Sequence, residues 1–288
     1  MFKNPFIFIL IHLIIYNMTR IIGVVSGKGG VGKTTLVSNL GASLAKEGYN
    51  VAIIDANLTG ANLGLHYGLI SYPISIHDVM KKNASLTDAI YKHPSGVDII
   101  PASLSFEDVL DTPPINIGQE IKTALADKDY VLIDAATGLD RETLNAIDMC
   151  DEFILVTHPE LPTISDALRT KSIISKYEKK LTGIVLNRVT KKDELKKDYI
   201  ASFFKLPILG VIPEDPSIRR SIELKNPIVL QNPNHKISLE VRKIANKIAG
   251  KEAKAGKSIL DTVLESFSFV LFGSPKKKAK AVETPKQK

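Results

Sequence analysis

The chain has 288 residues, of which 44% are hydrophobic, so it is long enough to bury a core of ordinary size. Its only cysteine, Cys150, excludes an intramolecular disulfide and any site that needs paired cysteines from one chain, and it indicates a reducing, cytoplasmic setting. The net charge is +7, but residues 251–288 carry nine lysines against four acidic residues, so the basic balance describes a tail rather than the whole chain.

Residues 1–17 form a hydrophobic leader. The run from Phe6 to Tyr16 is apolar except for His12, and it is shorter than the roughly 20 residues of an ordinary membrane span. No small-residue cleavage site follows it. Two interpretations stay open: an over-extended translation start, with Met18 as the natural first residue, or an N-terminal membrane anchor.

The first predicted strand and helix enclose a glycine-rich loop. The apolar run at residues 21–25 predicts a buried strand. A helix is predicted from about Thr34 to Glu47, because Leu36, Leu40 and Leu44 recur at helical spacing. The loop therefore has a strand before it and a helix after it.

Residues 27–35 read GKGGVGKTT and fit the phosphate-loop pattern G-x-x-x-x-G-K-[ST]. Glycines let such a loop turn its backbone N–H groups toward a triphosphate, and the helix N-terminus adds partial positive charge. We expect Lys33 to reach the β- and γ-phosphates and the Thr34 hydroxyl to bind Mg²⁺. The predicted phosphate-binding residues are Gly27, Lys28, Gly29, Gly30, Val31, Gly32, Lys33, Thr34, Thr35 and, from a later loop, Gly138.

Further apolar runs, rich in β-branched residues, alternate with helical patterns. Continuous runs of this kind are typical of strands buried on both faces of a parallel sheet. Residues 18–250 are therefore predicted to be a single α/β domain, a P-loop NTPase fold with a mostly parallel twisted sheet and helices on both faces. The runs are Val51–Ile54, Val97–Pro101, Tyr130–Ile133, Phe153–Thr157, Gly183–Leu186 and Ile208–Ile212.

Two aspartates follow predicted strands. Asp55 comes directly after residues 51–54, and Asp134 comes directly after residues 130–133. Ligands of open α/β sheets lie at the carboxyl ends of the strands. We therefore expect both carboxylates to lie near the bound ligand.

The second lysine of the loop, Lys28, gives the form K-G-G-x-G-K-T-T, which resembles the deviant Walker A loop of the MinD/ParA ATPases. The resemblance covers about residues 18–250 and is strongest to MinD-like, site-determining ATPases of cell division. It implies that Lys28 crosses a homodimer interface to the nucleotide of the other subunit. The single cysteine separates the chain from relatives that carry iron–sulfur clusters.

The segment Asp55-Ala56-Asn57 resembles the first switch of this family, which is usually D-x-D. In the family the second acid is associated with positioning the attacking water. An amide at Asn57 can accept a hydrogen bond but cannot take a proton. The resemblance makes Lys28, Lys33 and Asn57 the catalytic positions, and Asn57 leaves open whether hydrolysis is slow or another residue takes over.

Three further segments resemble parts of the family. Asp134 to Gly138 resembles the second switch, D-x-P-x-G, with Ala136 in place of the proline and the Gly138 N–H directed toward the γ-phosphate. The two switch resemblances imply that Asp55 and Asp134, together with Thr34, hold Mg²⁺, the cofactor that accompanies ATP. His158 replaces an asparagine of a T-N-P-E segment, and we expect it to be an ordinary loop residue. The adenine-binding positions implied by the resemblance are Asn187, Arg188, Pro213, Glu214 and Asp215.

The C-terminal segment combines a linker (251–257), a predicted amphipathic helix (258–272) and a lysine-rich end. An apolar helix face beside lysines is typical of a segment that binds anionic membrane. A helix packed on the domain, or one that binds a protein partner, stays open. The predicted membrane-facing residues are Leu260, Val263, Leu264, Phe267, Val270 and Leu271.

Together these features predict an ATPase that dimerises around two Mg·ATP and responds to an activating protein partner. The resemblance implies reversible attachment to the inner face of the cell membrane and a role in spatial regulation such as cell division. Two alternatives stay open. One is a ParA-like partitioning ATPase that binds DNA nonspecifically, and the other is an ATP-binding scaffold with little hydrolysis.

Overall fold

The computed structural model describes residues 19–113, 115–138, 141–193 and 195–251. The described residues up to Ala245 belong to one compact unit. The hydrophobic leader and the amphipathic tail helix lie outside the described residues, so the division of the chain into leader, ATPase domain and tail stays a prediction. Among the helices that the structure describes, none has the length and hydropathy needed to span a membrane.

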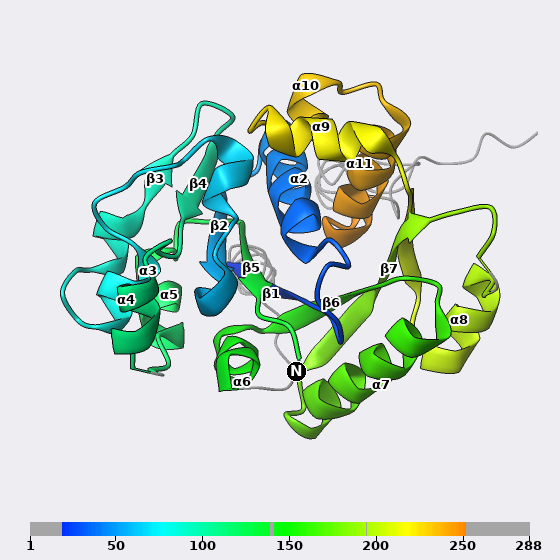
Figure 1. Cartoon of the computed structure of the whole chain (residues 1–288), viewed down its shortest axis with the longest axis horizontal. Coiled ribbons are helices and arrows are strands. Elements are labelled where there is room, and N and C mark those ends of the chain that lie inside the picture. The colour runs from blue at the N-terminus through cyan, green and yellow to red at the C-terminus, as the bar shows by residue number, and fades with distance from the viewer. Residues whose placement is uncertain (1–18, 114, 139–140, 194, 252–288) are drawn as a thin grey trace, which may run out of the picture. The chain divides into compact units, whose positions relative to one another are not determined.

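A sheet of eight strands runs through the described part of the chain in the order β3-β4-β2-β5-β1-β6-β7-β8 (Figure 1). Every neighbouring pair is parallel except β3 and β4. The predicted, mostly parallel sheet is therefore confirmed. The strands are β1 (Arg20–Val25), β2 (Val51–Ala56), β3 (Tyr91–Lys92), β4 (Val97–Ile100), β5 (Tyr130–Ala135), β6 (Glu152–Thr157), β7 (Lys180–Val189) and β8 (Ile208–Pro213).

Helices cover both faces of the sheet, as predicted. Helix α2 lies on one face together with α9, α10 and α11, whereas α6 and α7 lie on the other (Figure 1). The α-helices are α2 (Lys33–Lys46), α3 (Ile76–Met80), α4 (Phe106–Asp111), α5 (Gly118–Ala124), α6 (Arg141–Met149), α7 (Leu161–Lys176), α8 (Lys197–Phe204), α9 (Pro216–Glu223), α10 (Ile228–Gln231) and α11 (Lys236–Ile248). Short 3-10 turns are η1 (Leu58–Gly60), η2 (Gly64–Tyr67) and η3 (Leu86–Ala89).

The core forms where the predicted apolar runs meet the sheet. Strands β2, β5 and β6 are buried along their whole length. Helix α2 begins one residue before the predicted start and buries Leu36, Leu40 and Leu44 on the sheet side. Gly23 of β1 is needed for close packing, because a Cβ there would lie 2.4 Å from the Phe153 ring. The centre of the sheet is therefore tightly packed behind the glycine-rich loop.

The strand order places the functional loops together. Strand β1 lies between β5 and β6, so the loop that follows β1 is flanked by the loops after those two strands. A point where the strand order reverses is the usual ligand site of an open α/β sheet.

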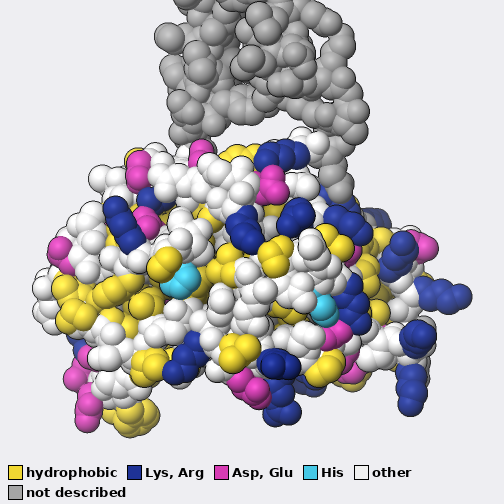
Figure 2. All heavy atoms as spheres, turned by 90° about the horizontal axis from the view of Figure 1, so that it is seen from above, with side chains coloured by type: hydrophobic (Ala, Val, Ile, Leu, Met, Phe, Trp, Pro, Cys, Tyr) yellow, Lys and Arg dark blue, Asp and Glu magenta, His cyan; other side chains and the backbone are white. Residues whose placement is uncertain are grey.

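On the face drawn in Figure 2, lysine and arginine side chains gather toward the side where α8 lies in Figure 1.

Phe153 tests the packing of the sheet. The side chain is fully buried, so we expect Phe153→Ala to lower the free energy of unfolding by about 3–5 kcal/mol. Phe106 is 74% exposed and serves as a matched control, for which Phe106→Ala should change stability by less than about 0.5 kcal/mol. Urea unfolding of both variants measures the difference. Equal losses would contradict the described core.

Candidate functional site

A lysine and two aspartates are buried beneath the phosphate loop. Asp55 and Asp134 are register partners on β2 and β5, and each is only 1% exposed. Burial raises the pKa of both carboxyl groups. Burial also lowers the pKa of Lys33, and the negative charges of the two aspartates act against that decrease. Lys33 Nζ also donates a hydrogen bond of 3.2 Å to Ser26 Oγ. The structure therefore brings one cation and two acids together at the strand ends.

The two carboxylates have different surroundings. Asp55 accepts backbone hydrogen bonds from Asn57 (3.2 Å), Asn62 (3.0 Å) and Leu63 (2.9 Å), which shape the loop after β2. Both oxygens of Asp134 lack a hydrogen-bond partner among the described residues, although they are buried. A buried carboxylate without a partner is costly.

The donor set around Asp134 fits Mg²⁺. Asp134 supplies two carboxylate oxygens, and Thr34, the second residue of α2 and the neighbour of Lys33, supplies a hydroxyl. Magnesium prefers oxygen ligands and usually keeps several waters or phosphate oxygens, so a site with few protein ligands is sufficient. The Asp134 carboxylate is therefore compatible with the predicted metal site. The Asp55 carboxylate is instead largely occupied by hydrogen bonds from the backbone of its own loop.

The glycine-rich loop is fixed at its start and open at its middle. A Cβ on Gly27 would lie 2.2 Å from the backbone of Asp166 on α7, so only glycine fits there. Gly30 and Gly32 adopt positive φ values of 75° and 92°. Lys28 is exposed at the surface of the loop. The loop thus has the backbone freedom that the phosphate-loop pattern requires.

The loop of the predicted second switch approaches the phosphate loop. Thr137 Oγ1 lies 3.9 Å from the position of a Cβ on Gly29. Gly138 adopts a positive φ of 93°, and no heavy atom of a described residue lies within 4 Å of a Cβ built there. The structure therefore places Thr137, the neighbour of Gly138, beside the middle of the phosphate loop, while the contact of Gly138 with a phosphate stays a prediction.

Beside the phosphate loop is a cavity of about 600 Å³. Its walls come from the start of α2, the ends of β7 and β8, and helices α9 and α11. All five residues predicted to bind adenine line it. The complete lining is Gly30, Gly32, Thr35, Leu36, Asn39, Asn187, Arg188, Ile212, Pro213, Glu214, Asp215, Pro216, Ile218, Arg219, Ile222, Ile237 and Val241.

Asn187 and Arg188 connect the cavity to the phosphate loop. Asn187 is buried and donates from Nδ2 to the Val31 carbonyl at 2.7 Å. Its Oδ1 makes no hydrogen bond to a described residue, so it could accept one from a bound base. Arg188, at a positive φ of 54°, pairs with Glu214 at 2.7 Å and reaches the Gly30 carbonyl at 3.4 Å.

Asp215 and His158 hold the surrounding backbone. Asp215 caps α9 by accepting from the Ser217 N–H at 2.9 Å, and it pairs with Lys236 at 2.7 Å. These bonds hold the pKa of Asp215 well below its usual range. His158 Nδ1 donates to the Asn187 carbonyl at 2.9 Å. Both side chains therefore support the cavity walls through hydrogen bonds within the chain.

Asn57 makes a bond that the sequence did not reveal. Its Nδ2 donates to the Gly60 carbonyl at 2.8 Å and closes the η1 turn. An aspartate could not donate this bond. In this arrangement the side chain stabilises its own loop.

The apolar wall of the cavity was not predicted. Ile218 and Ile222 of α9 face it together with Ile237 and Val241 of α11. In each helix the two residues are four positions apart, which places them on one helical face. This spacing was the available signal in the sequence, but it could not indicate that the two faces meet at a nucleotide-sized cavity.

Residues 22–228 match the model of the CobQ/CobB/MinD/ParA nucleotide binding domain. The chain is 36% identical over 258 residues to an uncharacterized ATP-binding protein of Methanocaldococcus jannaschii, covering 89% of this chain and 98% of that protein. It is 32% identical over 270 residues to the septum site-determining protein MinD of Thermotoga maritima, covering 87% and 98%. The Mg-ADP complex of MinD from Pyrococcus horikoshii superposes with a TM-score of 0.78, at 36% identity, over 82% of this chain and all (100%) of that one.

Gly27 tests the fixed start of the loop. We expect Gly27→Ala to destabilise the nucleotide-free protein by about 1–3 kcal/mol, because the added methyl group overlaps the α7 backbone. Gly29→Ala is the matched control, since its Cβ would meet only an ordinary contact at 3.9 Å, and it should change stability by less than about 0.5 kcal/mol. Thermal unfolding compares the two variants, and an unchanged Gly27→Ala protein would contradict the described contact.

Proposed function

The chain belongs to the CobQ/CobB/MinD/ParA nucleotide-binding family, and on this basis we propose that it is an ATPase that dimerises around Mg·ATP. The observation that supports this most is the buried group of Lys33, Asp55 and Asp134 beside a cavity of about 600 Å³. A cavity of this size is typical of small-molecule sites. The base would occupy the cavity and the phosphates would lie on the loop before α2.

Each residue has a role that follows from its position. Lys33 would contact the β- and γ-phosphates, and the backbone N–H groups of residues 27–35 would bind phosphate oxygens. Thr34 and Asp134 would hold Mg²⁺, with Asp55 shaping the neighbouring loop through its three backbone bonds. When bound, magnesium neutralises charge that develops on the phosphates. The adenine edge would meet Asn187 Oδ1.

The proposed dimer depends on the side chain of Lys28. The side chain is exposed, and it follows the fixed Gly27 directly. In the proposed dimer each Lys28 contacts the nucleotide of the partner subunit, so ATP bridges the two copies. A dimer would present two weak membrane-binding tails at once and raise the affinity for anionic lipid by effective concentration. We place the protein on the inner membrane face as a spatial regulator with an activating protein partner.

Substitutions of the two lysines in the phosphate loop distinguish nucleotide binding from dimerisation. We expect Lys33→Ala to weaken ATP binding at least about tenfold, because a charge-assisted phosphate contact is lost. Lys28→Ala should keep nucleotide affinity within about threefold but lose the ATP-dependent dimer, as measured by analytical ultracentrifugation with Mg·ATP. Lys92→Ala, an exposed lysine on β3, is the matched control.

The same samples can be sedimented with anionic vesicles. The wild type should bind vesicles more tightly with ATP than with ADP, and Lys28→Ala should bind equally with both nucleotides. An ATP-dependent dimer in Lys28→Ala would contradict the role of Lys28. Vesicle binding by the wild type that ignores nucleotide would contradict reversible attachment.

Hydrolysis is the step that Asn57 restrains in this proposal. The amide is hydrogen-bonded to Gly60 and cannot accept a proton from water. We expect Asn57→Asp to raise phosphate release from Mg·ATP by at least about tenfold, since a carboxylate becomes available next to the loop. Asn57→Ala removes the same bond without adding an acid, so its rate should stay low. An equal rise in both variants would mean that release of the loop, rather than a carboxylate, speeds turnover, and equally low rates would mean that Asn57 does not limit hydrolysis.

A further inference from the structure

Helix α4 turns apolar side chains outward. Leu104, just before the helix, is 50% exposed, and Phe106 and Leu110 are 74% and 68% exposed. Phe106 and Leu110 are four residues apart, so they share one side of the helix. Asp108, between them in sequence, is only partly exposed. We call Leu104, Phe106 and Leu110 the α4 face.

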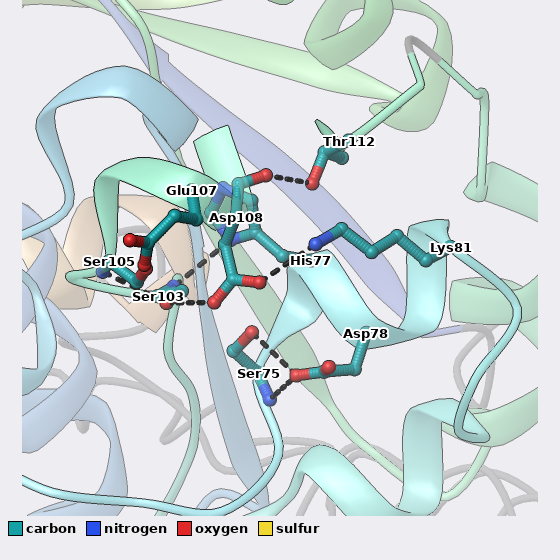
Figure 3. Close-up of polar contacts among 9 residues, drawn as sticks. All are labelled: Ser75, His77, Asp78, Lys81, Ser103, Ser105, Glu107, Asp108 and Thr112. Atoms are coloured by element: carbon teal, nitrogen blue, oxygen red, sulfur yellow. Dashed lines mark hydrogen bonds and ion pairs between the residues drawn. The ribbon is translucent and has the colours of Figure 1, made fainter. Parts of the chain in front are cut away.

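A polar cluster holds the helix in this orientation (Figure 3). Lys81 Nζ donates to Asp108 Oδ1 at 2.7 Å, and Ser103 Oγ donates to Asp108 Oδ2 at 2.6 Å. The Ser103 N–H donates to Nδ1 of the buried His77 at 3.0 Å. His77 lies in the first turn of α3 and Lys81 directly follows its last residue, so the two side chains are one helical turn apart and hold the segment that contains Ser103 and Asp108.

The cluster explains why α4 does not rotate to bury its apolar side chains. Turning Phe106 inward would expose Asp108 and break its bonds to Lys81 and Ser103. These bonds are only partly exposed to water, so breaking them leaves polar groups without partners, which costs free energy. The helix therefore presents its apolar side chains on a fixed support. Rigid, exposed aromatic and aliphatic side chains are typical of protein–protein contact sites.

We propose that the α4 face is a docking site for a partner protein, through a segment with apolar side chains flanked by lysine or arginine. The charge of the partner follows from Glu107 and Asp111, which are exposed on the same short helix. The third acid of the helix, Asp108, is neutralised by Lys81, so Glu107 and Asp111 supply the negative charge that a partner would meet. Complementary charge would orient such a segment over Phe106 and Leu110. An anionic lipid surface would be repelled by the same acids.

The test uses the full chain with Mg·ATP and two synthetic peptides. Both peptides form an amphipathic helix with the same leucine and phenylalanine face, and they differ in carrying lysines or glutamates beside it. Fluorescence anisotropy should give at least about tenfold tighter binding of the lysine peptide. The double variant Phe106→Ser and Leu110→Ser should weaken that binding at least about tenfold.

Matched variants control for general loss of hydrophobic surface and for charge. Tyr199→Ser with Phe203→Ser removes two exposed aromatic residues from α8 and should leave lysine-peptide binding unchanged. Glu107→Lys with Asp111→Lys should reverse the preference, so that the glutamate peptide binds more tightly. Equal binding of both peptides, or full binding by the Phe106 and Leu110 double variant, would overturn the proposal.

Other occupants of the α4 face give distinct results in the same set of proteins. If the Phe106 and Leu110 variant alone converts a dimer into a monomer, a second copy occupies the face. If it abolishes binding to anionic vesicles, lipid occupies the face. If Leu264→Ser with Phe267→Ser in the full chain raises peptide affinity, the chain's own tail occupies it. Each of these results would overturn docking of a separate partner.

Discussion

The burial of Lys33, Asp55 and Asp134 under one loop is the constraint on which the rest of the site depends. The register of β2 and β5 sets the two carboxylates opposite each other, and α2 brings the lysine over them. Charges in such surroundings are costly unless they are paired or bind a ligand. Asp55 is hydrogen-bonded by its loop, while both oxygens of Asp134 lack a hydrogen-bond partner among the residues that the structure describes. The unpaired carboxylate is what makes the site suited to a metal-bound triphosphate.

Side-chain hydrogen bonds to backbone groups hold the loops around this group. Asp55 gathers the loop after β2, and Asn57 closes its η1 turn through Gly60. Asn187 ties the end of β7 to Val31 of the phosphate loop, next to the cavity that α9 and α11 complete. Nucleotide binding would therefore act on segments that are already connected. This arrangement suits a protein whose surface responds to the bound nucleotide.

Sequence patterns predicted the parallel sheet, because apolar runs recur between helical segments, and they placed Asp55 and Asp134 at the carboxyl ends of two strands. Only the structure showed that these two strands, β2 and β5, are neighbours. The patterns missed β3, because a strand of two residues is too short to show an alternation of apolar and polar side chains. The bond from Asn57 to Gly60 depends on the folded turn, and the meeting of Ile222 with Val241 depends on tertiary packing between distant helices. The outward side of α4 also runs against the usual pattern, in which Phe and Leu face the core, because the network around Asp108 decides its orientation.

Thermal unfolding of Asp134→Asn, with and without Mg·ATP, tests the central claim most directly. The amide keeps the volume of the side chain but removes the buried charge, so the nucleotide-free variant should be at least as stable as the wild type. A ligand that binds only the folded state stabilises it, so Mg·ATP should raise the unfolding temperature of the wild type. We expect this gain to be lost in Asp134→Asn. A variant that gains as much as the wild type would contradict the assignment of Asp134 to the metal-bound nucleotide.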